Sequence, residues 1–206
     1  GTALILPEFQ WMIEGKEYID SFLFNPHKWM FTNFDCTAYF VKDAAQLIKT
    51  FEILPEYLKT RTRGRVNDYR DWGIPLGRRF RALKLWSVIR SYGVDGLQNK
   101  IRQHIRFASE LEGMIRNEAD FEILAPVVIN VVCFRYKPEG SAEDSLNRIN
   151  EKLNHALNDS GKLYLSHTAL GGKYTLRMVT GQTNVTLGHV QKAWELIRNT
   201  ARSIKI

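Results

Sequence analysis

The chain has 206 residues, of which 44% are hydrophobic and 25% charged, and this composition excludes disordered, collagen-like and coiled-coil proteins. Its 29 lysines and arginines against 22 acidic residues give a formal net charge of +7. The only cysteines, Cys36 and Cys133, are too few for a disulfide scaffold and indicate a reducing compartment. No apolar run approaches the roughly 18 residues of a membrane span, and no secretory signal peptide is visible. We therefore expect a cytoplasmic protein without a membrane partner.

Short strands and helices are predicted for the first third of the chain. Ser21 to Phe24 is a strand candidate, which the turn dipeptide Asn25-Pro26 ends. Thr37 to Val41 is rich in β-branched and aromatic residues, which predicts a buried strand. Asp43 then has the place of an N-cap for a helix from Ala44 to about Phe51.

The segment from Leu54 to Gly77 has little apolar periodicity and contains several glycines and prolines. Loops of this length are usually functional or disordered, and its position between two patterned regions favours a lid. One basic run lies inside it and a second follows it: Lys59, Arg61, Arg63 and Arg65, then Arg78, Arg79 and Arg81. Because no nucleic-acid motif accompanies this charge, we interpret the runs as a solvated loop and a helix start, and expect no nucleic-acid partner.

From Gly77 onward the pattern is helical and then becomes a compact α+β arrangement. One helix is predicted to stop at Tyr92-Gly93, and a second to run from about Asp95 to Arg116. Strands are predicted at 121–123, 127–135, 163–165 and 174–179, and helices from Ser141, with Asp144 as capping-box partner, and over 186–203. The buried face of the first of these helices is formed by Leu146, Ile149, Leu153 and Leu157. This order predicts a small antiparallel sheet with helices on one face.

One lysine has a setting that suits covalent chemistry. Lys28 lies in the segment FNPHKW (24–29), at the end of a predicted strand and among aromatic residues. Burial there would disfavour its cation and lower its pKa, and a neutral lysine is a nucleophile towards carbonyls, most often the aldehyde of a cofactor. Asn25 offers an amide suited to a phosphate oxygen. From these residues alone, a lysine that snorkels at a strand end is an equal alternative.

Seven segments in a fixed order carry a resemblance to one enzyme family. They are FLFNPHKWMFTNFDCTAYFVKD (22–43), LPEYLK (54–59), NDYRDWGIPLGRRFRALKLW (67–86), RSYGVDGLQNKIRQHI (90–105), VVCFR (131–135), KYTLRM (173–178) and HVQKAWELI (189–197). They resemble the group II pyridoxal-phosphate-dependent decarboxylases, and most closely the aromatic-L-amino-acid decarboxylases. The resemblance covers essentially the whole chain, and NPHKW and PLGRRFR are its most specific motifs.

The resemblance implies roles for five residues. Lys28 would form the internal aldimine with pyridoxal 5'-phosphate, Asn25 matches a position that hydrogen-bonds the cofactor phosphate, and His27 borders the site. Tyr57 matches the tyrosine of the mobile catalytic loop, which protonates the substrate α-carbon after carbon dioxide leaves. Phe34 matches an aromatic residue close to the neighbouring subunit's catalytic loop. The implied reaction converts an aromatic L-amino acid to its amine and CO2.

An α/β fold follows from the same resemblance. Residues 1–82 would form the end of an aspartate-aminotransferase-like (fold type I) large domain, with the catalytic loop at about 54–77, and residues 83–206 a small carboxy-terminal α+β domain with an antiparallel sheet. The family has a longer chain, and only its carboxy-terminal portion resembles this sequence. The other portion supplies the aspartate that pairs with the cofactor's pyridine nitrogen. We therefore expect this chain alone to be inactive and to act with the amino-terminal remainder of the same enzyme, as a homodimer of complete protomers.

Two other functions stay open. Similar enzymes that form aldehydes by oxidative deamination typically carry phenylalanine at the position of Tyr57, so the tyrosine favours simple decarboxylation. The second alternative is a non-enzymatic basic module that binds an anionic partner. We expect no metal site, because His104, His155, His167 and His189 are dispersed without ligand spacing. The sequence leaves open which aromatic amino acid is the substrate.

Overall fold

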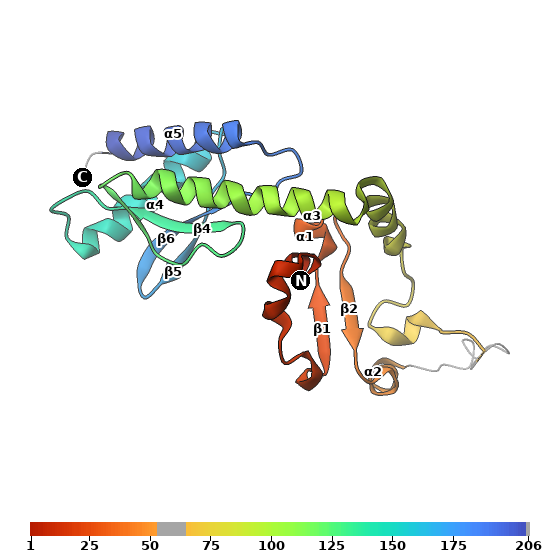
Figure 1. Ribbon diagram of the computed structural model, residues 1–206. Helices are drawn as coiled ribbons and strands as arrows, with labels where there is room; N and C mark the ends of the chain where they lie inside the picture. The colour runs from red at the N-terminus through yellow and green to blue at the C-terminus, as the bar shows by residue number, and fades with distance from the viewer. Residues whose placement is uncertain (53–64, 205–206) are drawn as a thin grey trace. The chain divides into compact units, whose positions relative to one another are not determined.

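The computed structural model describes residues 1–52 and 65–204 (Figure 1). The chain divides into two compact units, Gly1–Leu97 and Gln98–Ile206, and the boundary between them lies within the long helix α3 (Arg81–Arg116). The sequence places a domain boundary after residue 82 instead. That boundary concerns membership of a larger domain and stays a prediction.

The first unit consists of short elements that lead up to α3. In chain order they are the 3-10 helices η1 (Thr2–Ile5), η2 (Pro7–Ile13) and η3 (Lys16–Tyr18), strand β1 (Ser21–Phe24), helix α1 (Pro26–Trp29), strand β2 (Ala38–Val41), helix α2 (Ala44–Phe51) and the 3-10 helix η5 (Tyr69–Trp72). The N-cap prediction for α2 is confirmed, since Asp43 Oδ1 accepts the backbone N–H groups of Ala45 and Gln46 at 2.9 and 3.2 Å.

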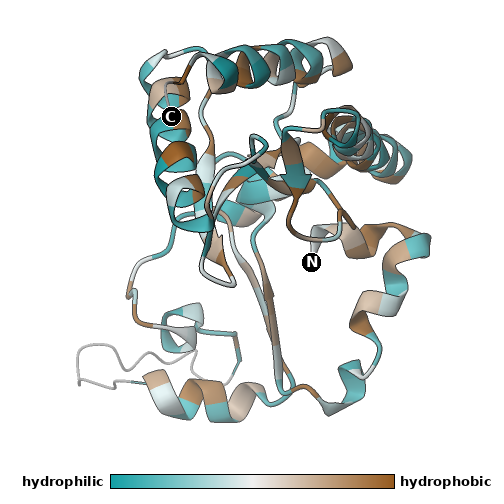
Figure 2. Ribbon diagram, turned by 90° about the vertical axis from the view of Figure 1, so that its left-hand side faces the viewer, coloured by the Kyte–Doolittle hydropathy of each residue, from teal (hydrophilic) through white to brown (hydrophobic). Residues whose placement is uncertain are grey.

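Strands β1 and β2 form an antiparallel two-stranded sheet, with Ser21 opposite Val41 and Phe24 opposite Ala38. Both strands are largely apolar (Figure 2). The expected burial of the second strand is wrong for this chain, because Tyr39 and Phe40 are 50% and 58% exposed. The physical reason is the sheet itself: two strands cannot cover both of their own faces.

Helix α3 contains the predicted interruption at Tyr92-Gly93. Gly93 has φ 65° and ψ 176°, so two helical segments meet there across a kink. A left-handed φ of this kind favours glycine because it has no Cβ to clash with the backbone. The prediction of two successive helices is therefore confirmed.

The second unit contains a four-stranded antiparallel sheet in the order β3-β4-β6-β5. Its elements are β3 (Phe121–Ile123), β4 (Val131–Tyr136), helix α4 (Glu143–Asp159), β5 (Ser166–Leu170), β6 (Lys173–Val179) and helix α5 (Leu187–Ser203). Helix α4 contacts both α5 and the central strands β4 and β6. Alternate residues of β4 (Val132, Phe134 and Tyr136) join the buried core together with Ile149, Leu153 and Leu157 of α4.

Three local predictions in this unit are wrong. The third strand runs over Ser166–Leu170 and not over 163–165, because the backbone of Leu165 is bonded to the Asn158 side chain, at 2.8 Å through its N–H and 3.0 Å through its C=O. Strand β4 begins at Val131 and not at residue 127. Helix α4 begins after Ala142 without a side-chain cap, so Asp144 is not a capping-box partner of Ser141.

Candidate active site

The motif lysine, Lys28, lies on α1, the four-residue helix that follows β1. Pro26 is buried at the first helical position, where its fixed φ and missing N–H are tolerated. Asn25 precedes it in an extended conformation, and its carbonyl accepts the N–H of Lys28 at 2.9 Å. Strand, turn and helix therefore present Lys28 directly after the end of β1.

The side chain of Lys28 is exposed in this chain. Its predicted aromatic neighbours do not cover it: Trp29 and Phe31 are half-buried, and the ring of Phe31 contacts that of Tyr92, with 5.8 Å between ring centroids. The expected burial of Lys28 is therefore wrong for the described part of the chain, because these rings pack beside the lysine and leave its side chain exposed.

The two neighbours predicted to serve the cofactor, Asn25 and His27, are held by the segment that leads into β2. The Oδ1 atom of Asn25 accepts the hydroxyl of Thr37 at 2.7 Å, which leaves the amide NH2 group to donate to another oxygen. The ring nitrogen Nδ1 of His27 lies 3.0 Å from the N–H and 2.6 Å from the carbonyl oxygen of Cys36. Because both backbone groups face one nitrogen, the ring is fixed in orientation in either tautomer.

The other two predicted residues differ in what the structure shows. Phe34 is 82% exposed, and its ring meets the ring of His27 edge to face, with 5.0 Å between centroids. Tyr57 lies outside the described residues, as does most of the basic run within the predicted lid. The structure therefore brings together Asn25, His27, Lys28 and Phe34.

Sequence reasoning missed an ion cluster next to these residues. The Asp35 carboxylate accepts from Arg81 Nε at 3.0 Å and also from Arg79, so the second basic run is partly neutralised within the chain. Burial opposes ionisation of Asp35, but the hydrogen bond from Arg81 and the positive charges outweigh it and lower its pKa. One feature of the sequence indicates such a partner: basic residues begin α3, whose first turn holds no acid.

Comparison with known proteins identifies the family. The family model described as pyridoxal-dependent decarboxylase conserved domain matches residues 1–137. The chain belongs to this family. Tyrosine decarboxylase 4 of Petroselinum crispum is 44% identical over 99% of this chain, and phenylacetaldehyde synthase of Arabidopsis thaliana is 45% identical over 98% of it. The chain spans about two fifths of these relatives, 41% of each.

A solved structure of this decarboxylase family confirms the predicted fold class. The crystal structure of Oryza sativa TDC with PLP and tryptamine matches 98% of this chain and 42% of that chain, with a TM-score of 0.92 and 39% identity. The fold is thus that of a pyridoxal-phosphate-dependent decarboxylase, and pyridoxal phosphate is the cofactor of the family. The residues present fit such a group: an open amine on Lys28 lies three residues after an amide, that of Asn25, whose NH2 suits a phosphate oxygen.

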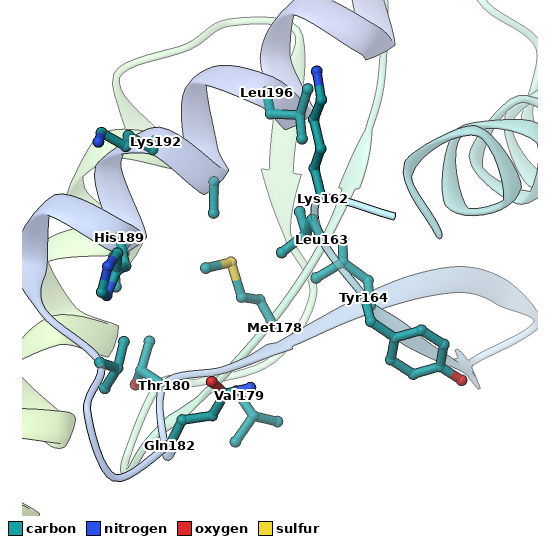
Figure 3. Close-up of a pocket in the computed structure, with 14 residues that line it drawn as sticks. Lys162, Leu163, Tyr164, Met178, Val179, Thr180, Gln182, His189, Lys192 and Leu196 are labelled. Carbon is teal, nitrogen blue, oxygen red and sulfur yellow. The ribbon is translucent and has the colours of Figure 1, made fainter. Parts of the chain in front are cut away.

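One hollow of the second unit is lined by residues that are distant in the sequence from every predicted site residue. It has a volume of about 670 Å³ and is lined within the second unit by Leu163, Met178 and Leu196, with Lys162 and Lys192 at its rim (Figure 3). Its buried polar lining residue, Thr180, donates its hydroxyl to the carbonyl of His104 at 2.8 Å. Ligand sites usually combine apolar walls with polar groups that fix orientation. The hydroxyl hydrogen of Thr180 is already used within the chain and the two lysines are exposed, so this lining does not define a ligand.

Two further results concern the described residues alone. None of their histidine, cysteine and carboxylate side chains gather in a group of three that could hold a metal ion. None of their helices is long and apolar enough to cross a membrane.

Proposed function

We propose that the complete protein is a pyridoxal-phosphate-dependent decarboxylase that converts an aromatic L-amino acid to its amine and CO2. The observation that carries this proposal is the match of residues 1–137 to the decarboxylase family, with the NPHKW motif folded so that Lys28 is presented after β1. The basic-module alternative has less support, because Asp35 already pairs with two of the arginines near this site. We also propose that the protein acts in the cytoplasm.

Each of the predicted cofactor-binding and catalytic residues has its own role in the proposed reaction. The amine of Lys28 would hold the cofactor, the amide of Asn25 would donate to its phosphate, and the fixed ring of His27 would border it. When bound, the cofactor withdraws electrons from the bond that breaks. Tyr57 then gives its phenolic proton to the substrate α-carbon, and a closed lid excludes water and oxygen while it does so.

The amino-terminal remainder of the enzyme is the proposed partner of the first unit. Fully buried apolar residues are few there, whereas Trp11, Leu23, Tyr39 and Phe40 are all at least half exposed. Such a surface is unusual for a unit that stands alone in water, and it fits residues 1–82 as the end of a larger domain. The remainder would supply the acid that pairs with the pyridine nitrogen, and two complete protomers would place Phe34 near the partner's catalytic loop.

A second candidate function is aldehyde formation by the same family. It is favoured by one specific observation, the 45% identity to phenylacetaldehyde synthase of Arabidopsis thaliana. The presence of Tyr57 favours the amine-forming reaction, because the phenol offers a proton where phenylalanine offers none.

The test is an assay of the complete protein with pyridoxal phosphate and a panel of four aromatic amino acids, scored for amine, aldehyde and CO2. We expect amine and CO2 in equal amounts, and borohydride should fix the cofactor to the peptide that contains Lys28. Lys28→Ala should lose both, whereas Lys49→Ala, which changes an exposed lysine of α2, should lose neither. Aldehyde as the main product would support the second candidate. Cofactor that never attaches, together with nucleic acid that binds, would support the basic module.

A further inference from the structure

The turn formed by residues 33–37 is bound from the side of α1. The N–H of Cys36 lies 3.0 Å from His27 Nδ1, and the carbonyl of Cys36 accepts the backbone N–H of His27 at 3.3 Å. Thr37 adds the bond to the side chain of Asn25. The turn therefore contacts both residues that flank Pro26, one of them adjacent to Lys28.

The same turn is bound from the side of α3. Lys84 Nζ donates to the backbone carbonyls of Asp35 at 2.8 Å and Asn33 at 3.0 Å. The thiol of Cys36 approaches the carbonyl of Arg81 at 3.8 Å, and Cys36 is 4% exposed. The Asp35 carboxylate also accepts from Arg79 and Arg81. The basic residues at the start of α3 therefore bind both the backbone and a side chain of the turn.

The charge arrangement gives a physical reason for the contact between Asp35 and the basic residues. Cations at the start of a helix oppose its macrodipole and are therefore unfavourable there unless a negative charge pairs with them. Arg81 is the first residue of α3, and no acid stands in its first turn. Asp35 supplies the missing negative charge from 46 residues earlier in the chain.

We propose that Asp35 is a positioning residue for Lys28. A helix of four residues has too few internal hydrogen bonds to hold its own place, so α1 depends on what contacts it. Asp35 fixes the turn to α3, the turn fixes His27 through Cys36, and His27 and Asn25 fix the segment that carries the amine. The proposal rests on the proposed cofactor role of Lys28.

The test compares two isosteric substitutions in the complete protein. Asp35→Asn keeps the shape of the side chain but turns an NH2 group towards an arginine. Asp120→Asn is the matched control, since Asp120 accepts from Arg202 Nε at 2.9 Å and Nη2 at 3.0 Å in the other unit. We expect Asp35→Asn to slow cofactor attachment at Lys28, measured by borohydride trapping, by about 10- to 100-fold, the range typical of a misplaced reacting group. Asp120→Asn should leave that rate within twofold.

A second readout needs no cofactor. Amide hydrogen exchange at Cys36, and the labelling rate of Lys28 by an amine reagent relative to Lys49, should both change in Asp35→Asn and not in Asp120→Asn. Asp35→Glu, which keeps the charge, should restore both in part. Unchanged exchange and unchanged attachment in Asp35→Asn would overturn the proposal, as would an equal loss in Asp120→Asn. If the unsubstituted protein attached no cofactor, the proposed function would fail, while the exchange result would still decide whether Asp35 holds the turn.

Discussion

At the residue scale, the sequence predicts that Tyr57 favours one of two reactions of this family. Both reactions remove CO2, and they differ in whether the α-carbon receives a proton or reacts with oxygen. We predict that Tyr57→Phe in the complete protein lowers amine formation by about 100-fold, within the range for loss of a positioned proton donor. Aldehyde, ammonia and hydrogen peroxide should appear as O2 is consumed. Product analysis with an oxygen electrode checks this, with Tyr164→Phe, at an exposed tyrosine of the second unit, as the control. Unchanged amine output would remove Tyr57 from the mechanism.

His104 shows how burial, as the largest of several causes, lowers the pKa of a histidine. It is fully buried on α3, and burial, with the charge of Lys100 added, lowers its pKa to about 4, although a hydrogen bond with the backbone of Gln182 opposes the shift. The imidazole of His104 takes up a proton near pH 6.5 in the unfolded chain but only near pH 4 in the folded chain. Its contribution to stability is therefore fully present above pH 6.5 and is lost as the pH falls towards 4. We predict a loss of about 2 kcal/mol between pH 7 and 5 from this residue.

Chemical denaturation at a series of pH values measures this effect. His104→Met should flatten the decline over that interval, because methionine binds no proton. A variant that keeps the full slope would show that other groups cause it. The carboxylates of Glu118 and Asp120, whose pKa values are lowered mainly by hydrogen bonds from Arg198 and Arg202, act at lower pH. Their contribution is present above the unfolded pKa and is lost as pH falls through the folded one.

Helix α4 contacts the sheet through polar side chains as well as through its apolar face. Asn150 is fully buried, and its amide accepts the N–H of Tyr136 at 2.8 Å and donates to the carbonyl of the same residue at 2.8 Å. Asn147 makes the analogous pair at a more open place, with Tyr174 N at 2.7 Å and Gly172 O at 2.9 Å. These amides bond backbone groups that lie beyond Phe134 and Leu176, the last pair that β4 and β6 form with each other.

We predict that Asn150→Ala lowers the free energy of unfolding of this unit by about 2–4 kcal/mol, because two buried backbone groups of Tyr136 lose their partners. Asn147→Ala should cost less than half as much, since water can reach the groups it leaves. Urea denaturation of both variants gives the comparison. Equal decreases in the free energy of unfolding would contradict the prediction, because they would show that burial of the amide does not increase its contribution.

Elements formed by local interactions could be predicted from the sequence. The cap at Asp43, the buried face of α4 and the break at Gly93 each depend on residues a few positions apart, and each is confirmed. The strand expected at 163–165 could not be predicted correctly, since an asparagine on α4 bonds that backbone instead. The Asp35 cluster was missed because its partners lie 44 to 49 residues away in the chain.

At the scale of the whole molecule, the two units differ in whether they contain a core. The hydrophobic core cluster, from Phe107 to Ala201, lies entirely in the second unit, where α3, α4 and α5 meet the sheet. The first unit has Leu6 and Leu97 buried but leaves much of the β1-β2 sheet in solvent. The chemistry predicted for Lys28 is therefore carried by the unit whose described residues contribute nothing to that core cluster.

We predict that residues 98–206 fold when expressed alone and that residues 1–97 do not. Burial of apolar side chains is the main stabilising contribution, and a lone two-stranded sheet is marginally stable in water. Residues 98–206 should melt cooperatively and give dispersed amide resonances. Residues 1–97 should bind a hydrophobic dye strongly or aggregate, and should become ordered only when the amino-terminal remainder is present. A cooperative transition in isolated residues 1–97 would contradict this division, and so would the absence of one in residues 98–206.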